Sequence, residues 1–136
     1  MGDIAGLRVG LKGSAEVVVG EQHTAPKVGS GRVHVLATPV MINLIEAAAL
    51  AAVEHLLPHG QQSLGTRLDV RHFAATPVGM RVSAAAELIR IEGRLLTFRV
   101  SATDAIEPIG DGTHERMIVT LARFDQRVQK KVAQIR

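Results

Sequence analysis

The chain has 136 residues, a length typical of one domain that can bury a core without disulfides or metals. Hydrophobic residues make up 46% of it and charged residues 21%, a balance that excludes an intrinsically disordered chain. Cysteine is absent, so disulfides, thiol nucleophiles and thiolate zinc sites are excluded. With no Trp or Tyr and only three Phe, the chain has no base-stacking platform, and we expect no nucleic-acid partner.

The net charge of +3 is concentrated at the carboxyl end. From residue 123 onward, one acid, Asp125, faces five basic residues: Arg123, Arg127, Lys130, Lys131 and Arg136. We therefore expect one domain over residues 1–136 whose last part, 124–136, is a solvated basic tail. A nucleotide phosphate could use this tail, but nothing in the sequence requires it.

No targeting or membrane signal is evident. The amino end lacks a basic stretch followed by an apolar run, so we expect a cytoplasmic protein. The most apolar segment, residues 35–57, is interrupted by Asn43, Glu46, Glu54 and His55. We therefore expect no membrane span.

The amino-terminal third predicts one strand and a loop. Residues 14–19 alternate and then become apolar, which is typical of a strand. Residues 20–31 contain a proline and a Gly-Ser-Gly run and are expected to form a loop. Residues 32–37 could form a further short strand.

A long apolar helix is predicted next. Thr38 is a plausible N-cap, Pro39 suits the first turn, and the helix would continue over residues 40–57. The Pro58–Gly60 run would end it. Because the helix is apolar nearly all round, we expect it to be buried on most sides.

Four strands are predicted after the helix, over residues 63–73, 80–91, 94–103 and 113–124. Between the last two, residues 107–112 carry Pro and Gly and are expected to connect them. The fold class is therefore α+β, with one long buried helix wrapped by a curved antiparallel sheet. This arrangement is the hotdog fold.

Glu46 is the sharpest chemical signal. It lies in the middle of the predicted helix between Leu44, Ile45, Ala47 and Ala48. Burial there would raise the pKa of its carboxyl group, which suits a general base or a carboxylate nucleophile. The alternatives are a helix edge that meets solvent and a structural salt bridge.

Taken one by one, the other candidates have ordinary structural explanations. His72 could be a satisfied or exposed histidine, Thr38 a helix cap, Gly65 a β-bulge and Arg116 a surface strand residue. No dinucleotide or P-loop motif is present, and no spacing indicates a metal site.

Taken together, these residues resemble the fluoroacetyl-CoA thioesterase group of the hotdog-fold thioesterases. The resemblance covers residues 35–124. It is carried by Ala37-Thr38, Glu46, Ser63-Leu64-Gly65-Thr66, His72, Ala74-Ala75-Thr76-Pro77, Ala86-Glu87-Leu88, Glu92-Gly93-Arg94, Arg99-Val100-Ser101-Ala102, Ile109-Gly110 and Gly112-Thr113-His114-Glu115-Arg116.

The resemblance implies a thioesterase that hydrolyses a small acyl-CoA to free acid and CoA. It implies Thr38, Glu46 and His72 as the catalytic set, with Gly65 and Arg116 lining or supporting the pocket. It also implies a homodimer or higher oligomer with interfacial active sites, and no metal or other cofactor apart from the CoA of the substrate.

The residue types fit thioester hydrolysis. Glu46 could attack the carbonyl carbon and form an anhydride, or it could activate water, and the sequence does not choose between these roles. His72 could shuttle protons, Thr38 could orient the carboxylate, and a backbone N–H near Gly65 could stabilise the oxyanion.

The proposed set carries a geometric condition. On a straight helix, Glu46 would lie ~12 Å along the axis from Thr38, at ~1.5 Å per residue. We therefore predict that the regular helix starts near Met41 or Ile42, with Thr38 folded back in a loop. Otherwise Thr38 would only cap the helix.

The substrate is less constrained than the reaction. Fluoroacetyl-specific members of the group carry aromatic residues in a lid segment ahead of the helix, whereas no aromatic residue precedes Phe73 here. We therefore expect a short or otherwise small acyl-CoA, with a carrier-protein thioester as a further possibility. The alternatives to a thioesterase are a non-catalytic acyl-CoA-binding hotdog domain and a hydratase or dehydratase on the same fold.

Overall fold

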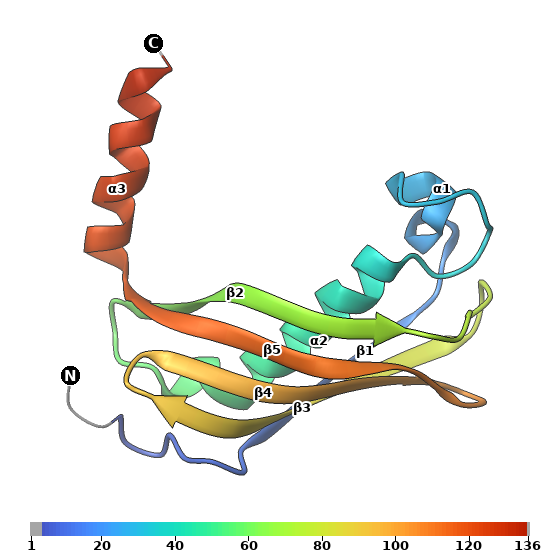
Figure 1. The fold of residues 1–136 in the computed structure, drawn as a ribbon, viewed down its shortest axis with the longest axis horizontal. Helices are drawn as coiled ribbons and strands as arrows, with labels where there is room; N and C mark the ends of the chain where they lie inside the picture. The colour runs from blue at the N-terminus through green and yellow to red at the C-terminus, as the bar shows by residue number, and fades with distance from the viewer. Residues whose placement is uncertain (1–3, 136) are drawn as a thin grey trace.

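The structure is a computed structural model that describes residues 4–135. Five strands form one antiparallel sheet in the order β1-β3-β4-β5-β2. Their bounds are β1 Lys12–Val18, β2 Gln61–His72, β3 Arg81–Glu92, β4 Leu95–Asp104 and β5 Pro108–Thr120. Figure 1 shows the sheet curling around a central helix, as the sequence predicts.

The central helix is α2, Thr38–Val53, and a 3₁₀ turn, η2 Glu54–Leu56, continues it. It packs on the inner face of the sheet, where alternate β4 residues are buried: Leu96, Phe98, Val100 and Ala102. Strand period 2 places these four on one face, which confirms the alternation read from the sequence.

The helix lies unusually close to β1 at Gly13. A Cβ at this position would collide with the α2 backbone at Ala48 and Ala52. The missing side chain therefore allows strand and helix backbones to approach each other.

One side of α2 stays open. Only six of its sixteen residues are buried: Met41, Ile45, Ala48, Ala49, Ala52 and Val53. Asn43, Ala47 and Ala51 are exposed. The expectation that this helix is buried on most sides is therefore wrong for a single chain.

The segment Thr38–Leu56 is long and apolar enough to cross a membrane by length and composition, with a mean hydropathy of 1.4. By these criteria, its polar residues do not exclude a span, contrary to our expectation. The core helix of a soluble domain meets the same criteria, and the sheet packed against α2 is typical of such a helix.

The segment before α2 is mostly irregular. It contains η1 Glu21–His23 and the short helix α1 Ala25–Val28. The predicted strand over residues 32–37 is absent, and a single bridge from Thr24 to Leu36 takes its place.

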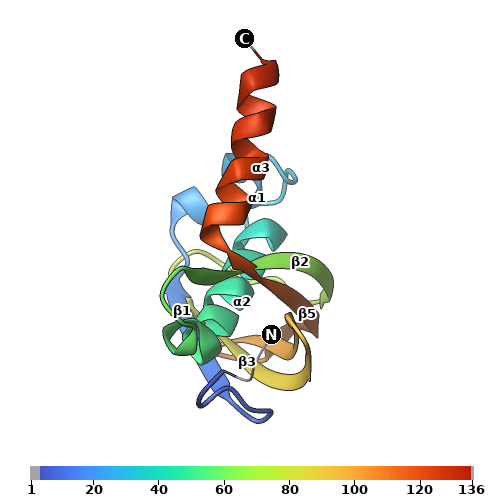
Figure 2. The same cartoon turned by 90° about the vertical axis from the view of Figure 1, so that its left-hand side faces the viewer.

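The carboxyl end differs most from expectation. β5 begins at Pro108, inside the predicted connection, and ends at Thr120 rather than at residue 124. The chain then forms a helix, α3 Leu121–Gln134, in place of the expected tail. Figures 1 and 2 show α3 standing clear of the sheet and of α2.

The α3 sequence is amphipathic, which explains why it is helical. Apolar side chains recur at helical spacing: Leu121, Phe124, Val128, Val132 and Ile135. At 3.6 residues per turn, Arg123 and Lys130 lie on the side of the helix opposite this apolar stripe.

Candidate active site

Thr38 and His72 meet at the amino end of α2. The Thr38 Oγ1 and His72 Nδ1 atoms are 2.7 Å apart, within hydrogen-bond distance. Thr38 is the first residue of α2, and His72 is the last residue of β2. A cavity of about 270 Å³ adjoins the pair and is lined by Ala25, Ser30, Val35, Leu36, Thr38, His72, Phe73, Ala74 and Ala75.

His72 is held in its neutral form. Burial lowers the pKa of its imidazole below 6.5, because a charged ring would lose hydration there. Its second nitrogen, Nε2, is buried and has no hydrogen-bond partner within the described chain. The Ala74 backbone acts on the ring in the opposite direction and raises its pKa, by less than burial lowers it.

Glu46 lies on the same helix, eight positions after Thr38, and faces the neighbouring strands β2 and β5. Its Oε2 atom is 3.5 Å from Nη1 of Arg116. The Glu46 side chain is 36% exposed and that of Arg116 only 6%. Glu46 is therefore a solvent-accessible carboxylate beside a buried cation, rather than a carboxylate enclosed by apolar groups.

Arg116 is fixed by partners on β2. Its Nε donates to the Ser63 hydroxyl at 2.8 Å, and its Nη2 donates to the Ser63 carbonyl at 3.0 Å. The same hydroxyl donates to Glu54 Oε1 at 2.6 Å, and the Ser63 N–H donates to Glu54 Oε2 at 2.9 Å. Arg116 is therefore a buried positioning cation and not a surface strand residue.

His114 completes this cluster as a neutral ring. Burial lowers its pKa, and the neighbouring Arg116 charge acts in the same direction. With Nδ1–H donating to the Arg67 carbonyl at 2.8 Å, Nε2 accepts from Arg116 Nη1 at 3.1 Å. Burial also lowers the pKa of Arg116, while the Glu54 and Glu46 carboxylates oppose that shift.

Gly65 leaves the space in which the Glu46 carboxylate sits. A Cβ at this position would lie 2.6 Å from Glu46 Oε2 and 3.2 Å from Cε1 of His114. The register of β2 against β5 shifts between Gly65 and Arg67, which confirms a bulge at this glycine. The backbone is thereby exposed beside the carboxylate.

The two groups of residues do not meet within one chain. The structure joins Thr38 to His72, and it joins Glu46 to Gly65 and Arg116. The predicted late start of the helix is wrong, because α2 is regular from Thr38 onward. Ala37, in extended conformation, is the N-cap, and Pro39 fits the first turn because that turn needs no N–H donor there.

Three residues around Arg116 were not proposed as site residues from the sequence: Glu54, Ser63 and His114. The available signal was strand parity. His114 and Arg116 are two residues apart on β5, so they point to the same inner face. Two polar residues at alternate, core-facing positions of a strand predict a buried hydrogen-bond network.

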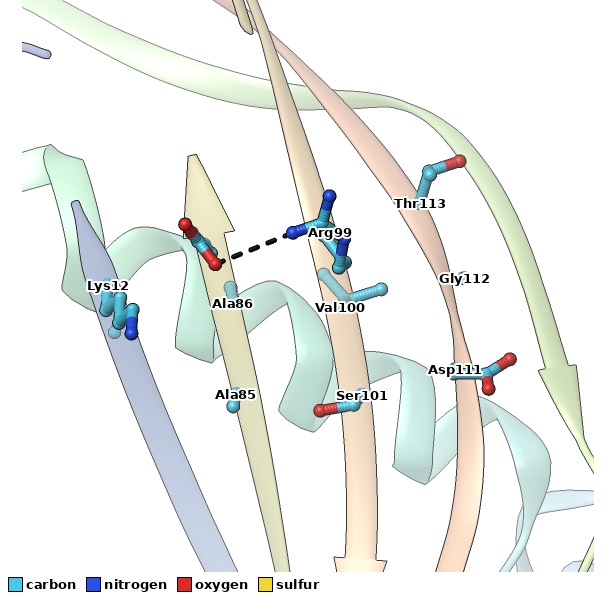
Figure 3. Close-up of a pocket in the computed structure, with 11 residues that line it drawn as sticks. Lys12, Ala85, Ala86, Arg99, Val100, Ser101, Asp111, Gly112 and Thr113 are labelled. Atoms are coloured by element: carbon cyan, nitrogen blue, oxygen red, sulfur yellow. Dashed lines mark ion pairs between the residues drawn. The ribbon is translucent and has the colours of Figure 1, made fainter. Parts of the chain in front are cut away.

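A larger cavity, of about 560 Å³, lies elsewhere, on the outer face of the sheet. Figure 3 shows it with α2 behind the strands. Its lining includes Glu87 and Arg99, which form an ion pair of 3.6 Å. None of the predicted site residues lines it. Within residues 4–135, no group of three His, Asp or Glu side chains is placed to hold a metal ion.

Comparison with known proteins identifies the family. The sequence model of the family described as fluoroacetyl-CoA-specific thioesterase matches residues 19–122. A fluoroacetyl-CoA thioesterase from Streptantibioticus cattleyicolor is 46% identical over 97 residues, which cover 71% of this chain and 70% of that protein.

Solved structures agree with this match. The fluoroacetyl-CoA thioesterase FlK superposes with a TM-score of 0.87 at 39% identity, covering 93% of this chain and 98% of that chain. A hypothetical Thermus thermophilus protein, described as a thioesterase superfamily member, gives a TM-score of 0.88 at 27% identity, covering 96% of both chains. These likenesses confirm the hotdog fold, and the chain belongs to the fluoroacetyl-CoA-specific thioesterase family.

Proposed function

We infer that this protein is an acyl-CoA thioesterase, a hydrolase that converts a thioester to free acid and CoA. Family membership supports the reaction class. The observation that carries the chemistry is the position of the Glu46 carboxylate. It is solvent-accessible, it lies beside the buried Arg116, and the missing side chain of Gly65 leaves room for it. A non-catalytic acyl-CoA-binding domain is not favoured, because it would need no such carboxylate.

Glu46 has two possible roles in this proposal. As a nucleophile, its oxygen bonds to the carbonyl carbon, CoA thiolate leaves, and water then cleaves the mixed anhydride. As a general base, it takes a proton from water, which attacks the carbonyl carbon as CoA leaves. In both roles the reacting carboxylate is the one whose Oε2 lies 3.5 Å from Nη1 of the buried Arg116.

In this proposal, Thr38 and His72 act on the same thioester as Glu46 and approach it from the opposite side. With the Thr38 hydroxyl donating to Nδ1, the neutral ring of His72 carries its proton on Nε2. Donation of that proton to the leaving thiolate or to the carbonyl oxygen requires the ring to turn toward the substrate, because Nε2 is buried in the free chain. A backbone N–H near the bulge at Gly65 is a further donor for the oxyanion.

The active site is proposed to form between two subunits. Glu46 is eight positions after Thr38 on a regular helix, which is ~12 Å along the axis at ~1.5 Å per residue. A second chain can supply the missing group if its α2 packs against the open, apolar side of this α2. In the sheet order, β2 is an edge strand, and its exposed edge offers a second surface for contact with that chain.

The substrate is proposed to be a short acyl-CoA in the cytoplasm, without a metal or redox cofactor. The cavity beside Thr38 and His72 is small, and Phe73 is its one aromatic lining residue. No Phe, Tyr or Trp precedes α2, so this chain has no aromatic residue that could form a lid selecting fluoroacetyl groups. The relatives solved with acetyl-CoA, and with fluoroacetate and CoA, support an acyl group of this size.

Release of CoA thiol from a panel of acyl-CoAs tests the reaction. The panel contains acetyl-, fluoroacetyl-, branched, medium-chain and aryl-acyl-CoA, and the protein adds no thiol background because it has no cysteine. We expect turnover of the short members and its loss in Glu46→Ala. Absence of turnover on every member by the folded protein would contradict the proposal.

A further inference from the structure

A second pocket lies where α3 leaves the sheet. Its volume is about 250 Å³, and the end of β5, Met117–Thr120, forms one wall. Arg94 reaches it from the β3–β4 turn, while Arg123, Phe124 and Arg127 reach it from the first two turns of α3. The family match ends at residue 122, so the α3 part of this pocket lies beyond that match.

The three arginines carry uncompensated charge. None of them takes part in an ion pair within residues 4–135; the same holds for Arg8, Arg32 and Arg67, which do not line this pocket, whereas the other described arginines are paired. No acidic residue lines the pocket. Arg123 and Arg127 are four residues apart on one helix face, where like charges repel each other. An anion bound between them would relieve that repulsion.

We propose that this pocket binds the phosphate groups at the nucleotide end of the CoA substrate. The proposal rests on the proposed thioesterase function. Guanidinium groups present forked donors that match phosphate oxygens. The Phe124 ring is 38% exposed and offers an aromatic face beside them for the adenine ring.

The position suits a ligand whose reacting group and charged group are far apart. Arg116, beside the Glu46 carboxylate, is four residues before Thr120 on β5, a span of ~13 Å at ~3.3 Å per residue. In CoA the pantetheine arm separates the thioester from the phosphates. We therefore expect the site for the phosphates to lie at such a distance from Glu46, on either subunit, and not beside Glu46.

The test compares Arg123→Gln/Arg127→Gln with Lys130→Gln/Lys131→Gln, a control that removes two charges from the same helix outside the pocket. Each is assayed with one acyl group on CoA and on pantetheine, which has no phosphate. We expect the arginine variant to raise KM for acyl-CoA about tenfold, with kcat and the KM for acyl-pantetheine unchanged. An unchanged KM, or an equal rise in the lysine control, would overturn the proposal.

Binding of adenosine 3′,5′-bisphosphate, measured by calorimetry, separates this proposal from the proposed reaction. We expect the arginine variant to bind it about tenfold more weakly and the lysine control to bind it like the parent. This holds even if no thioester is hydrolysed. Equal binding by all three proteins would contradict the phosphate pocket and leave the thioesterase assignment intact.

Discussion

At the residue scale, the proposed chemistry depends on how Arg116 is held. The Ser63 hydroxyl and carbonyl accept two of its N–H groups, and Glu54 accepts the proton of that hydroxyl. A chain of charge-assisted hydrogen bonds therefore runs from Glu54 through Ser63 and Arg116 to the Glu46 carboxylate. Glu54 and Ser63 are positioning residues, since they act on the site only through Arg116.

Ser63→Ala removes the hydroxyl from this chain. We expect kcat to fall about tenfold with a small change in KM, because Arg116 loses one of its anchors while substrate contacts remain. Melting temperatures measured alongside separate lost positioning from lost folding. Ser14→Ala, at an exposed position on β1, is the control and should leave kcat unchanged.

The two neutral histidines predict how stability varies with pH. Burial lowers the pKa of His72 and of His114 below 6.5, so the unfolded chain binds more protons than the folded one as the pH falls through that value. The free energy of unfolding should be highest above pH 6.5 and should decrease toward the lowered pKa values. Denaturant titrations from about pH 7.5 to pH 5 measure it.

His114→Gln isolates one of these contributions. Glutamine keeps a polar side chain beside Arg116 but does not titrate, so the decline below pH 6.5 should be shallower than in the parent. A decline of equal steepness in the two proteins would show that His114 does not contribute.

At the element scale, the approach of β1 to α2 depends on Gly13. Gly13→Ala places a methyl group against the backbone at Ala48 and Ala52, which cannot move aside as a flexible side chain could. We expect a loss of about 1–3 kcal/mol in the free energy of unfolding. Ser14→Ala, whose side chain faces solvent on the same strand, should change it by less than about 0.5 kcal/mol.

The main elements could be predicted from the sequence because their signals are periodic. The alternation in residues 94–103 and the apolar run after Thr38 define β4 and α2. The end of β5 could not be found this way, because residues 113–124 continue without a Gly or Pro and the change from period 2 to helical spacing at Leu121 is gradual.

The candidate site could be predicted only in part. The resemblance proposed Thr38, Glu46, His72, Gly65 and Arg116 as site residues, and the structure divides them into two groups. The residues that hold Arg116 were missed because hydrogen bonds between Glu54, Ser63 and His114 join positions far apart in the chain. Sequence periodicity carries no information about such long-range contacts.

At the scale of the whole molecule, a single chain is incomplete in two ways. The apolar α2 leaves Asn43, Ala47 and Ala51 exposed on one side, and the Thr38–His72 pair is not joined to Glu46 within the described chain. Pairing of two chains through this side would cover the helix and bring Thr38 and His72 of one subunit toward Glu46 of the other. The proposed homodimer explains both features with one contact.

Mixed dimers test this account most directly. One chain carries Thr38→Ala and His72→Ala, the other carries Glu46→Ala, and each is inactive alone. If an active site takes Thr38 and His72 from one subunit and Glu46 from the other, the mixed dimer contains one intact site and one doubly damaged site. We predict that co-refolding the two chains restores acyl-CoA hydrolysis, to about half the parent rate per mixed dimer. Mixed dimers that form but remain inactive would contradict a site shared between subunits.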